Sequence, residues 1–157
     1  MHPNPAPFDP GALVVEDARE EDREWVLAVW KENEAILGSL NVAHRTFYWH
    51  FNRPRTAPTS PERWIVIRPH GFAHFRIRKD TLRNVQEIAV ASTAKRRGVG
   101  RRLLEAVGNP VILKTNADHE ESNAFYRAQG FTLVSRSAGR DGRPLNHYQR
   151  WDTECAE

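Results

Sequence analysis

The stretch EIAVASTAKRRGVGRRLLEAV, Glu87 to Val107, joins a strand-like pattern to a helix-like pattern through a turn that holds two glycines. Small and β-branched residues lead into the turn, and apolar residues at helical spacing follow it before Gly108. The pattern predicts a strand, a sharp turn at Gly98 and Gly100, and a helix. The first N–H groups of such a helix have no partner within it, and the helix dipole adds partial positive charge beside them. We therefore expect an anion site at this turn.

Five basic side chains surround the two glycines in the sequence KRRGVGRRLL, Lys95 to Leu104. Three interpretations are open at this point. The side chains could face a polyanion such as a nucleic acid, or the backbone of the turn could bind one phosphorylated ligand. A glycine turn with solvated arginines beside it is also common in proteins that bind neither.

Length and composition favour one soluble domain. The chain has 157 residues, 39% hydrophobic and 27% charged, and no apolar run approaches the ~20 residues that cross a bilayer. The net charge of +3 favours anionic ligands without indicating a dedicated nucleic-acid binder. We expect a disordered tail over 1–11, one domain over 12–151 and a C-terminal tail over 152–157, with no membrane association.

Cysteine and histidine positions give no pattern typical of a metal site. The single cysteine, Cys155, lies near the end of the chain, so the sequence predicts neither an internal disulfide nor a cysteine-based metal cage. His70 and His74 are four residues apart, but the strand-like pattern around Gly71 argues against a helical metal pair. We expect a cytoplasmic protein without a bound metal.

Strand and helix patterns extend outward from the turn on both sides. The aromatic-dense segment HRTFYWHF, 44–51, fits neither pattern clearly. The whole order predicts an α/β (α+β) fold, a mixed sheet with helices on both faces. The expected elements are a strand over 12–17, a helix opened by a capping box from Asp17 to Glu20, strands over 63–68, 71–78 and 84–91, a helix over 98–107, a strand over 111–116, a helix over 122–128, and strands over 131–136 and 145–151.

A second motif, SNAFYRAQGF from Ser122 to Phe131, follows the strand after the turn helix. The two motifs, in this order and at this spacing, resemble the signature of the GNAT superfamily of acyl-CoA-dependent N-acyltransferases. The specific likeness covers Glu87 to Phe131, and the order of elements extends it to about Leu13 to Trp151. The resemblance implies a GNAT-like mixed, largely antiparallel central sheet with helices on both faces, and acetyl-CoA as the acyl-donor substrate.

The resemblance also implies which residues bind acetyl-CoA. The glycine turn would wrap the pyrophosphate, largely through backbone N–H groups, and backbone N–H groups of the preceding strand would hold the acyl carbonyl. The family often has an asparagine seven residues before the motif tyrosine, where this chain has His119, so Asn116 and Asn123 are alternatives for that contact. The expected cofactor-binding residues are Ala89, Val90, Ala91, Lys95, Arg96, Arg97, Gly98, Val99, Gly100, Arg101, Asn116, Asn123 and Phe125.

Acyl transfer to an amine needs a base for the amine and an acid for the leaving thiolate. Glu87 precedes the turn on the predicted strand, and the family often uses an acidic residue there as a base acting through water. Tyr126 stands where the family has its general acid, and a phenol with a pKa of about 10 holds its proton at neutral pH. Glu87 could instead be a salt-bridged strand residue and Tyr126 a packing residue, while Phe125 belongs to the core or contacts the cofactor.

The acceptor is not defined by the sequence. The leading hypothesis is an N-acetyltransferase acting on a primary amine of a small molecule or peptide, by direct attack in a ternary complex. The alternatives are an acetyltransferase acting on nucleic acid, either an aminoacyl-tRNA toxin-like enzyme or one that acts on a modified base, and a non-catalytic acyl-CoA-binding protein.

Segment 44–51 could be core or could stack on a planar acceptor, and a homodimer is open. The other acceptor-side candidates are Arg53, Arg55, Arg76, Arg78, Asp141, His147 and Tyr148.

Overall fold

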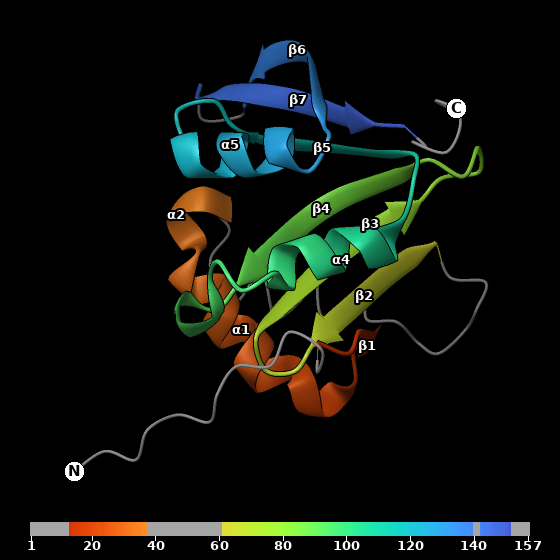
Figure 1. Ribbon diagram of the computed structural model, residues 1–157, viewed down its shortest axis with the longest axis vertical. Helices are drawn as coiled ribbons and strands as arrows, with labels where there is room; N and C mark the ends of the chain where they lie inside the picture. The colour runs from red at the N-terminus through yellow and green to blue at the C-terminus, as the bar shows by residue number, and fades with distance from the viewer. Residues whose placement is uncertain (1–12, 38–60, 140–141, 152–157) are drawn as a thin grey trace.

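The three strands expected between residues 63 and 91 form the centre of one sheet. The computed structural model describes residues 13–37, 61–139 and 142–151. Within them, β2 (Glu62–Ile67), β3 (Gly71–Ile77) and β4 (Arg83–Val90) lie side by side and pair antiparallel (Figure 1). Short turns join these strands, which is sufficient for antiparallel neighbours.

The sheet continues through β5 (Val111–Asn116) to β7 (Pro144–Arg150) and β6 (Thr132–Ala138). Its described strands follow the order β1-β2-β3-β4-β5-β7-β6. β5 runs parallel to β4, and the two strands pair only where Arg83 meets Val111 and Asn84 meets Ile112. Beyond these pairs the strands diverge, as Figure 1 shows, and the sheet opens between its two halves.

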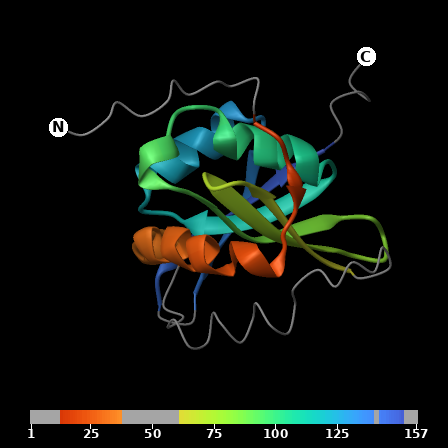
Figure 2. The ribbon, with the colours of Figure 1, turned by 90° about the horizontal axis from the view of Figure 1, so that it is seen from below.

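Helices cover both faces of the sheet (Figure 2). α1 (Arg23–Glu32) lies on one face and continues into the short α2 (Glu34–Leu37). α4 (Val99–Val107) and α5 (Glu120–Ala128) lie on the other face. The apolar stripes of α1 and α4 account for this packing because each stripe is buried against the sheet. The stripes are formed by Val26, Val29 and Trp30 on α1, and by Val99, Leu103, Leu104 and Val107 on α4.

Successive residues of β3 point to opposite faces of the sheet. Gly71 faces α4 so closely that an added Cβ would lie 2.8 Å from the Cγ1 atom of Val99. His74, three positions along the strand, therefore lies on the α1 side of the sheet. Glu87 is paired directly opposite His74 on β4 and shares that side.

The first strand and the start of the first helix differ from the prediction. β1 spans only Glu16–Asp17, instead of the expected strand over 12–17. A 3-10 turn, η2 (Glu20–Asp22), precedes α1, and Asp22 rather than Asp17 provides the capping carboxylate. Its Oδ2 atom accepts a hydrogen bond from the Arg19 N–H at 2.7 Å.

Tertiary contacts explain why the Asp22 carboxylate, rather than that of Asp17, accepts the hydrogen bond at the start of this turn. Its side chain is buried, and its Oδ1 atom accepts hydrogen bonds from the Trp25 indole at 2.8 Å and from Arg68 Nε at 2.7 Å. Arg68 follows β2, so the contact joins two segments far apart in the sequence. Local spacing cannot reveal such a partner.

The α/β class, the mixed and mostly antiparallel sheet, and the helices on both faces are confirmed. The helix expected over 122–128 begins two residues earlier, at Glu120. None of the helices within the described ranges has the length and apolar character needed to cross a membrane. Segment 44–51 and the two tails lie outside the described residues, so the domain limits stay a prediction.

Candidate functional site

A cavity of about 1060 Å3 lies where β4 and β5 diverge. β4, the first turn of α4, β5 and α5 form most of its wall, and the end of α1, α2 and the start of β7 complete it. Both predicted sequence motifs therefore contribute to one cavity. Among the described residues no three histidine, cysteine, aspartate or glutamate side chains are grouped as a metal site would require.

The turn before α4 uses its two glycines in different ways. Gly98 has a φ of +86°, in the left-handed region that glycine adopts without a Cβ clash. Gly100 lies in the first helical turn, where an added Cβ would lie 3.0 Å from the Phe125 ring. The Arg102 N–H donates to the Gly98 carbonyl at 2.9 Å, and the N–H groups before it have no intrahelical acceptor. This end of α4 has the geometry of an anion site.

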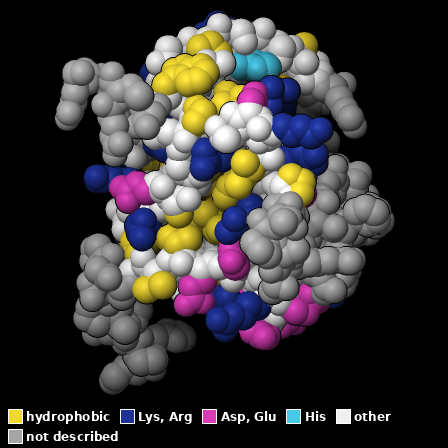
Figure 3. Space-filling view, turned by 90° about the vertical axis from the view of Figure 1, so that its right-hand side faces the viewer, with side chains coloured by type: hydrophobic (Ala, Val, Ile, Leu, Met, Phe, Trp, Pro, Cys, Tyr) yellow, Lys and Arg dark blue, Asp and Glu magenta, His cyan; other side chains and the backbone are white. Residues whose placement is uncertain are grey.

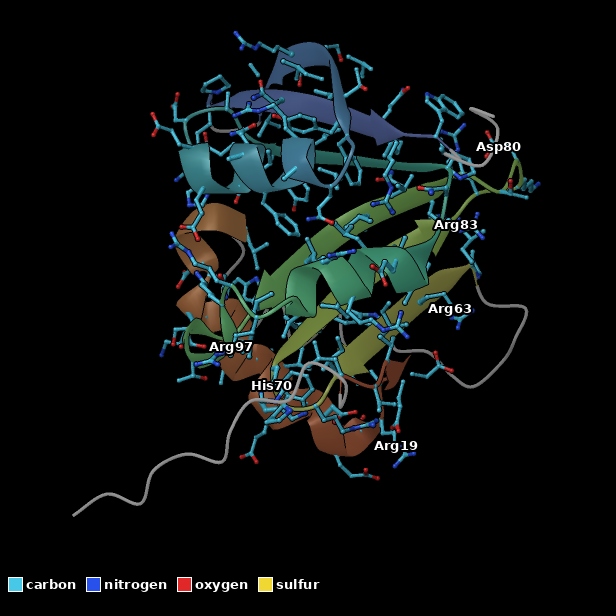
Figure 4. All side chains as sticks on the ribbon, in the orientation of Figure 1. Arg19, Arg63, His70, Asp80, Arg83 and Arg97 are labelled. Carbon is cyan, nitrogen blue, oxygen red and sulfur yellow. The ribbon has the colours of Figure 1, made fainter. Side chains whose placement is uncertain are left out.

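Most of the basic turn lies on the cavity wall. Lys95, Arg96 and Arg101 line the cavity together with the two glycines. Arg97, labelled in Figure 4, lies on the turn but not on the cavity wall. The Arg101 Nε atom lies 3.2 Å from Glu105 Oε1, so this cation is paired with an acidic residue of its own helix. The backbone N–H groups of the turn therefore distinguish it as an anion site more than its basic side chains do.

The backbone of β4 forms the opposite side of the cavity. The Ala91 N–H donates to the His70 carbonyl at 2.7 Å, whereas the Val90 carbonyl accepts a hydrogen bond from Asn33 Nδ2 at 3.1 Å. Because alternate residues of a strand direct their backbone groups to opposite edges, Ala89 and Ala91 face β3 and Val90 faces the gap toward β5. Of the three residues expected to hold the acyl carbonyl, Val90 alone presents its backbone to the cavity.

Glu87 lines the cavity from β4 although only 6% of its surface is exposed. Its Oε1 atom lies 3.7 Å from His74 Nδ1, across the β3–β4 pair. Glu87 can therefore pair with His74 and still border the substrate space, so the two roles expected for it are compatible. One carboxyl oxygen faces a histidine, and the side chain borders the space that a substrate would fill.

Tyr126 reaches the cavity from α5 and is 8% exposed. Its ring packs against Phe125, Phe131 and Tyr148, with ring centroids 5.4, 5.6 and 5.8 Å apart respectively. Burial, with a smaller contribution from Tyr148, raises the pKa of Tyr126 above that of a free phenol. A tyrosine with this pKa stays protonated at neutral pH, as a general acid must before it acts.

Asn123 does not face the cavity, so its expected contact with the cofactor is not supported. Its Nδ2 atom donates to the carbonyls of His119 at 2.7 Å and Asn116 at 3.0 Å. Its Oδ1 atom accepts hydrogen bonds from Tyr148 Oη at 2.6 Å and Asn146 Nδ2 at 2.8 Å. These bonds use the side chain's donors and acceptor to join α5, β5 and β7.

Asn116 and His119 both line the cavity, at the end of β5 and the start of α5. His119 caps α5, because its side chain accepts a hydrogen bond from the Ser122 N–H at 3.1 Å. Phe125 both lines the cavity and packs against Gly100, which combines the two roles considered for it.

The acceptor-side candidates are mostly engaged elsewhere. Tyr148 is fully buried, and His147 Nε2 lies 2.6 Å from Ser137 Oγ, away from the cavity wall. Arg76 pairs with Glu62 at 3.0 Å, and Arg78 pairs with Asp80 at 3.1 Å. Asp141, Arg53, Arg55 and segment 44–51 lie outside the described residues.

Asn33 and Leu37 also line the cavity, from the end of α1 and from α2, and were not predicted from the sequence. Nothing in their local sequence marks them, because only the divergence of β4 and β5 brings these segments together. Arg143 and Leu145, at the start of β7, line the cavity as well, and they belong to the last hairpin, 138–148, which the family resemblance places at the acceptor pocket. On the face shown in Figure 3, basic and acidic side chains are interspersed rather than segregated.

Comparisons with known proteins agree with this geometry. Residues 60–133 match the family model described as Acetyltransferase (GNAT) domain. The 5-NmdU N-acetyltransferase of Pseudomonas phage PaMx11 is 35% identical over 150 residues, which cover 88% of this chain and 99% of that protein.

Solved structures share the fold at lower identity. Ard1 from Thermoplasma volcanium superposes with a TM-score of 0.68 at 18% identity, covering 87% of this chain and 95% of its own. The protein yncA from Salmonella typhimurium, solved with its cofactor acetyl-CoA, has a TM-score of 0.62 at 14% identity, covering 88% of this chain and 92% of its own.

Proposed function

Because this chain belongs to the GNAT acetyltransferase family, we propose that it transfers the acetyl group of acetyl-CoA to a primary amine on a modified nucleobase. One observation supports this acceptor class above others, the similarity to the phage 5-NmdU N-acetyltransferase over nearly the whole length of both chains. The aligned regions cover 88% of this chain and 99% of that protein. This similarity moves a modified base ahead of the small-molecule or peptide amine that was the leading hypothesis.

We assign the pyrophosphate of acetyl-CoA to the first turn of α4. The N–H groups of Val99, Gly100 and Arg101 precede the first intrahelical bond, and the helix dipole favours negative charge beside them. The absence of a side chain at Gly100 lets a ligand approach the backbone next to Phe125. When bound there, acetyl-CoA supplies a thioester whose carbonyl the Val90 N–H can stabilise.

Glu87 and Tyr126 divide the proton transfers between opposite walls of the cavity. The Glu87 carboxylate accepts a proton from the acceptor's ammonium group, directly or through a water molecule, and leaves a neutral amine to attack the thioester. Tyr126 donates its proton to the departing thiolate, since burial raises its pKa and keeps it protonated until then. Acetyl-CoA and the acceptor occupy the cavity together, which permits direct attack of the amine on the thioester in a ternary complex.

A small acceptor, such as a free nucleotide, is the second candidate beside a base within DNA. The pairing of surface arginines with acidic side chains favours the small acceptor over a long polyanion. Arg76, Arg78 and Arg101 are each paired with an acidic side chain, at distances of 3.0 to 3.2 Å. Paired arginines release few counterions on binding a phosphate backbone, so these three positions contribute little to holding extended nucleic acid. The modified base could therefore be accepted as a free nucleotide rather than within a polymer.

The test is release of the CoA thiol from acetyl-CoA with four separate acceptors: free 5-NmdU, a DNA strand that contains it, small amines, and peptides with free N-termini. We expect transfer to one of the two 5-NmdU acceptors. Transfer only to the amines or peptides would refute the proposed acceptor. Binding of acetyl-CoA without transfer to any acceptor would favour the third hypothesis, a non-catalytic acyl-CoA-binding protein.

A further inference from the structure

His74 lies buried between two glutamates that come from different strands. It is 2% exposed on β3, with Glu62 of β2 on one side and Glu87 of β4 on the other. Its Nε2 atom lies 2.7 Å from Glu62 Oε2, and its Nδ1 atom lies 3.7 Å from Glu87 Oε1. Each ring nitrogen therefore faces a carboxylate, and only Glu87 borders the cavity.

The surroundings of the cluster favour the imidazolium form of His74. Burial alone would lower the pKa of His74, but the hydrogen bonds and charges of Glu62 and Glu87 outweigh it, and the pKa is raised. Trp64 stacks on the ring at 4.1 Å with an interplanar angle of 7°, which suits a cation over an indole. Arg76 Nη1 lies 3.0 Å from Glu62 Oε1 and completes a chain of alternating charges.

Side chains from β2, β4 and α1 pack around His74 within the part of the chain that the structure describes. β2 contributes Glu62 and Trp64, and β4 contributes Glu87. α1 packs against the same side of the sheet with apolar side chains that do not titrate, namely Val26, Val29 and Trp30. Glu62 and Glu87 are thus the titratable partners of His74 within the described residues.

We propose that Glu62 and His74 are positioning residues that hold Glu87 as a carboxylate aimed at the cavity. The inference rests on the proposed function, since it takes Glu87 as the base for the acceptor amine. A buried carboxyl group loses hydration, which favours its neutral form, and a cation within about 4–6 Å favours the ionised form. The His74 imidazolium supplies that cation, and Glu62 keeps the imidazolium charged and oriented.

Glu62→Gln tests the proposal because it removes the charge that supports His74 while it keeps the size of the side chain. We expect kcat/KM for free 5-NmdU to fall about tenfold at pH 6 and to stay within about twofold of wild type at pH 9. The activity lost at pH 6 should be recovered as the pH rises, with the KM for acetyl-CoA unchanged. An equal loss at every pH would indicate a merely structural role and overturn the proposal.

Asp80→Asn is the matched control. Asp80 is paired with an arginine, as Glu62 is, but it is exposed and lies in the β3–β4 turn, away from the cavity wall (Figure 4). We expect Asp80→Asn to keep the wild-type pH profile. A shift as large as that of Glu62→Gln would assign the effect to general surface charge.

Titration of the His74 ring by nuclear magnetic resonance provides a readout that needs no acceptor. We expect the ring to titrate above a free histidine in the wild type, and at lower pH in both Glu62→Gln and Glu87→Gln. A ring that titrates like free histidine, or that ignores both substitutions, would overturn the proposal. If the wild type transfers acetyl to no acceptor, the proposed function fails, and this titration still decides the state of the cluster.

Discussion

The glycine turn, Lys95 to Arg101, follows β4, and the cluster of Glu62, His74 and Glu87 lies on β2, β3 and β4. The two regions differ in how the sequence brings their functional groups together. The turn consists of consecutive residues and offers mainly its backbone. The cluster consists of three side chains from three strands and depends on strand register. A site of the first kind can be recognised in the sequence, whereas a site of the second kind appears only once the strands are aligned.

An irregularity in the pairing of β3 with β4 lies immediately beside the cluster. His74 is paired with Glu87, but the next residue, Phe75, is paired with Val85, because the register shifts between the two positions. A bulge of this kind inserts one residue on one strand and changes which side chains face each other. The pairing of His74 with Glu87 is therefore the last regular pair before the shift.

The largest expected effect concerns Tyr126, which comes from a contiguous motif as the glycine turn does. Tyr126→Phe removes the proton donor, and positioned acids contribute about 10²–10⁴ in rate, so we expect kcat to fall by at least ~10². The affinity for acetyl-CoA should change little, since the ring is kept. Steady-state kinetics and calorimetric titration of acetyl-CoA measure the two effects, and a kcat within threefold of wild type would remove Tyr126 from the mechanism.

Tyr148→Phe is the control for that experiment. Tyr148 is also buried, but its hydroxyl donates to Asn123 and does not line the cavity. We expect a loss of about 1 kcal/mol in the free energy of unfolding, with kcat near the wild-type value.

The next effect concerns Asp22, a second side-chain cluster that depends on tertiary contacts. Asp22→Asn removes the charge that pairs with Arg68 and leaves that guanidinium partly uncompensated. We expect the free energy of unfolding, measured with urea, to fall by about 2 kcal/mol. Asp17→Asn, whose side chain is 64% exposed beside Arg63, should cost far less. Equal losses would show that burial does not distinguish the two pairs.

The same distinction explains what could be predicted from the sequence. Strand and helix patterns predicted the order of elements, and Gly98 and Gly100 predicted the turn, because each depends on neighbours within a few residues. Glu87 was identified as a candidate base from its place before the turn. Its partner His74 was considered only as a metal ligand, because nothing local indicates that it faces two carboxylates.

Asn123 shows the opposite error. Its place in the second motif suggested a cofactor contact, yet it bonds Tyr148 and Asn146, which follow about 25 residues later. Local sequence located the residue on the correct helix but could not show which side of the helix the strand β7 would cover.

A smaller effect is expected within the glycine turn itself. Gly100→Ala places a methyl group 3.0 Å from the Phe125 ring, so the ring or the helix must shift. We expect the dissociation constant of acetyl-CoA to rise about tenfold, equivalent to about 1.4 kcal/mol, because the backbone N–H groups move from their position. Adding Phe125→Leu should recover part of the affinity. No recovery would mean that the methyl group blocks the ligand directly.

The smallest effect is the dependence of stability on pH, and it separates the two regions most directly. The His74 pKa is raised in the folded protein, so its contribution to stability is complete below the unfolded value of about 6.5 and is lost as pH rises through the folded value. Burial alone would raise the Glu62 pKa, but the hydrogen bonds and charges of His74 and Arg76 together outweigh burial and the pKa is lowered. The contribution of Glu62 to stability is therefore lost as pH falls.

We therefore expect urea unfolding from pH 4 to 9 to show a stability maximum between these two limits. In Glu62→Gln the decline on the alkaline side should be smaller and end at lower pH, because the His74 pKa is raised less. Gly100→Ala removes no titratable group, so its stability curve should run parallel to that of the wild type. If both variants gave parallel curves, the cluster would contribute no charge coupling, and the two regions would differ in sequence separation alone.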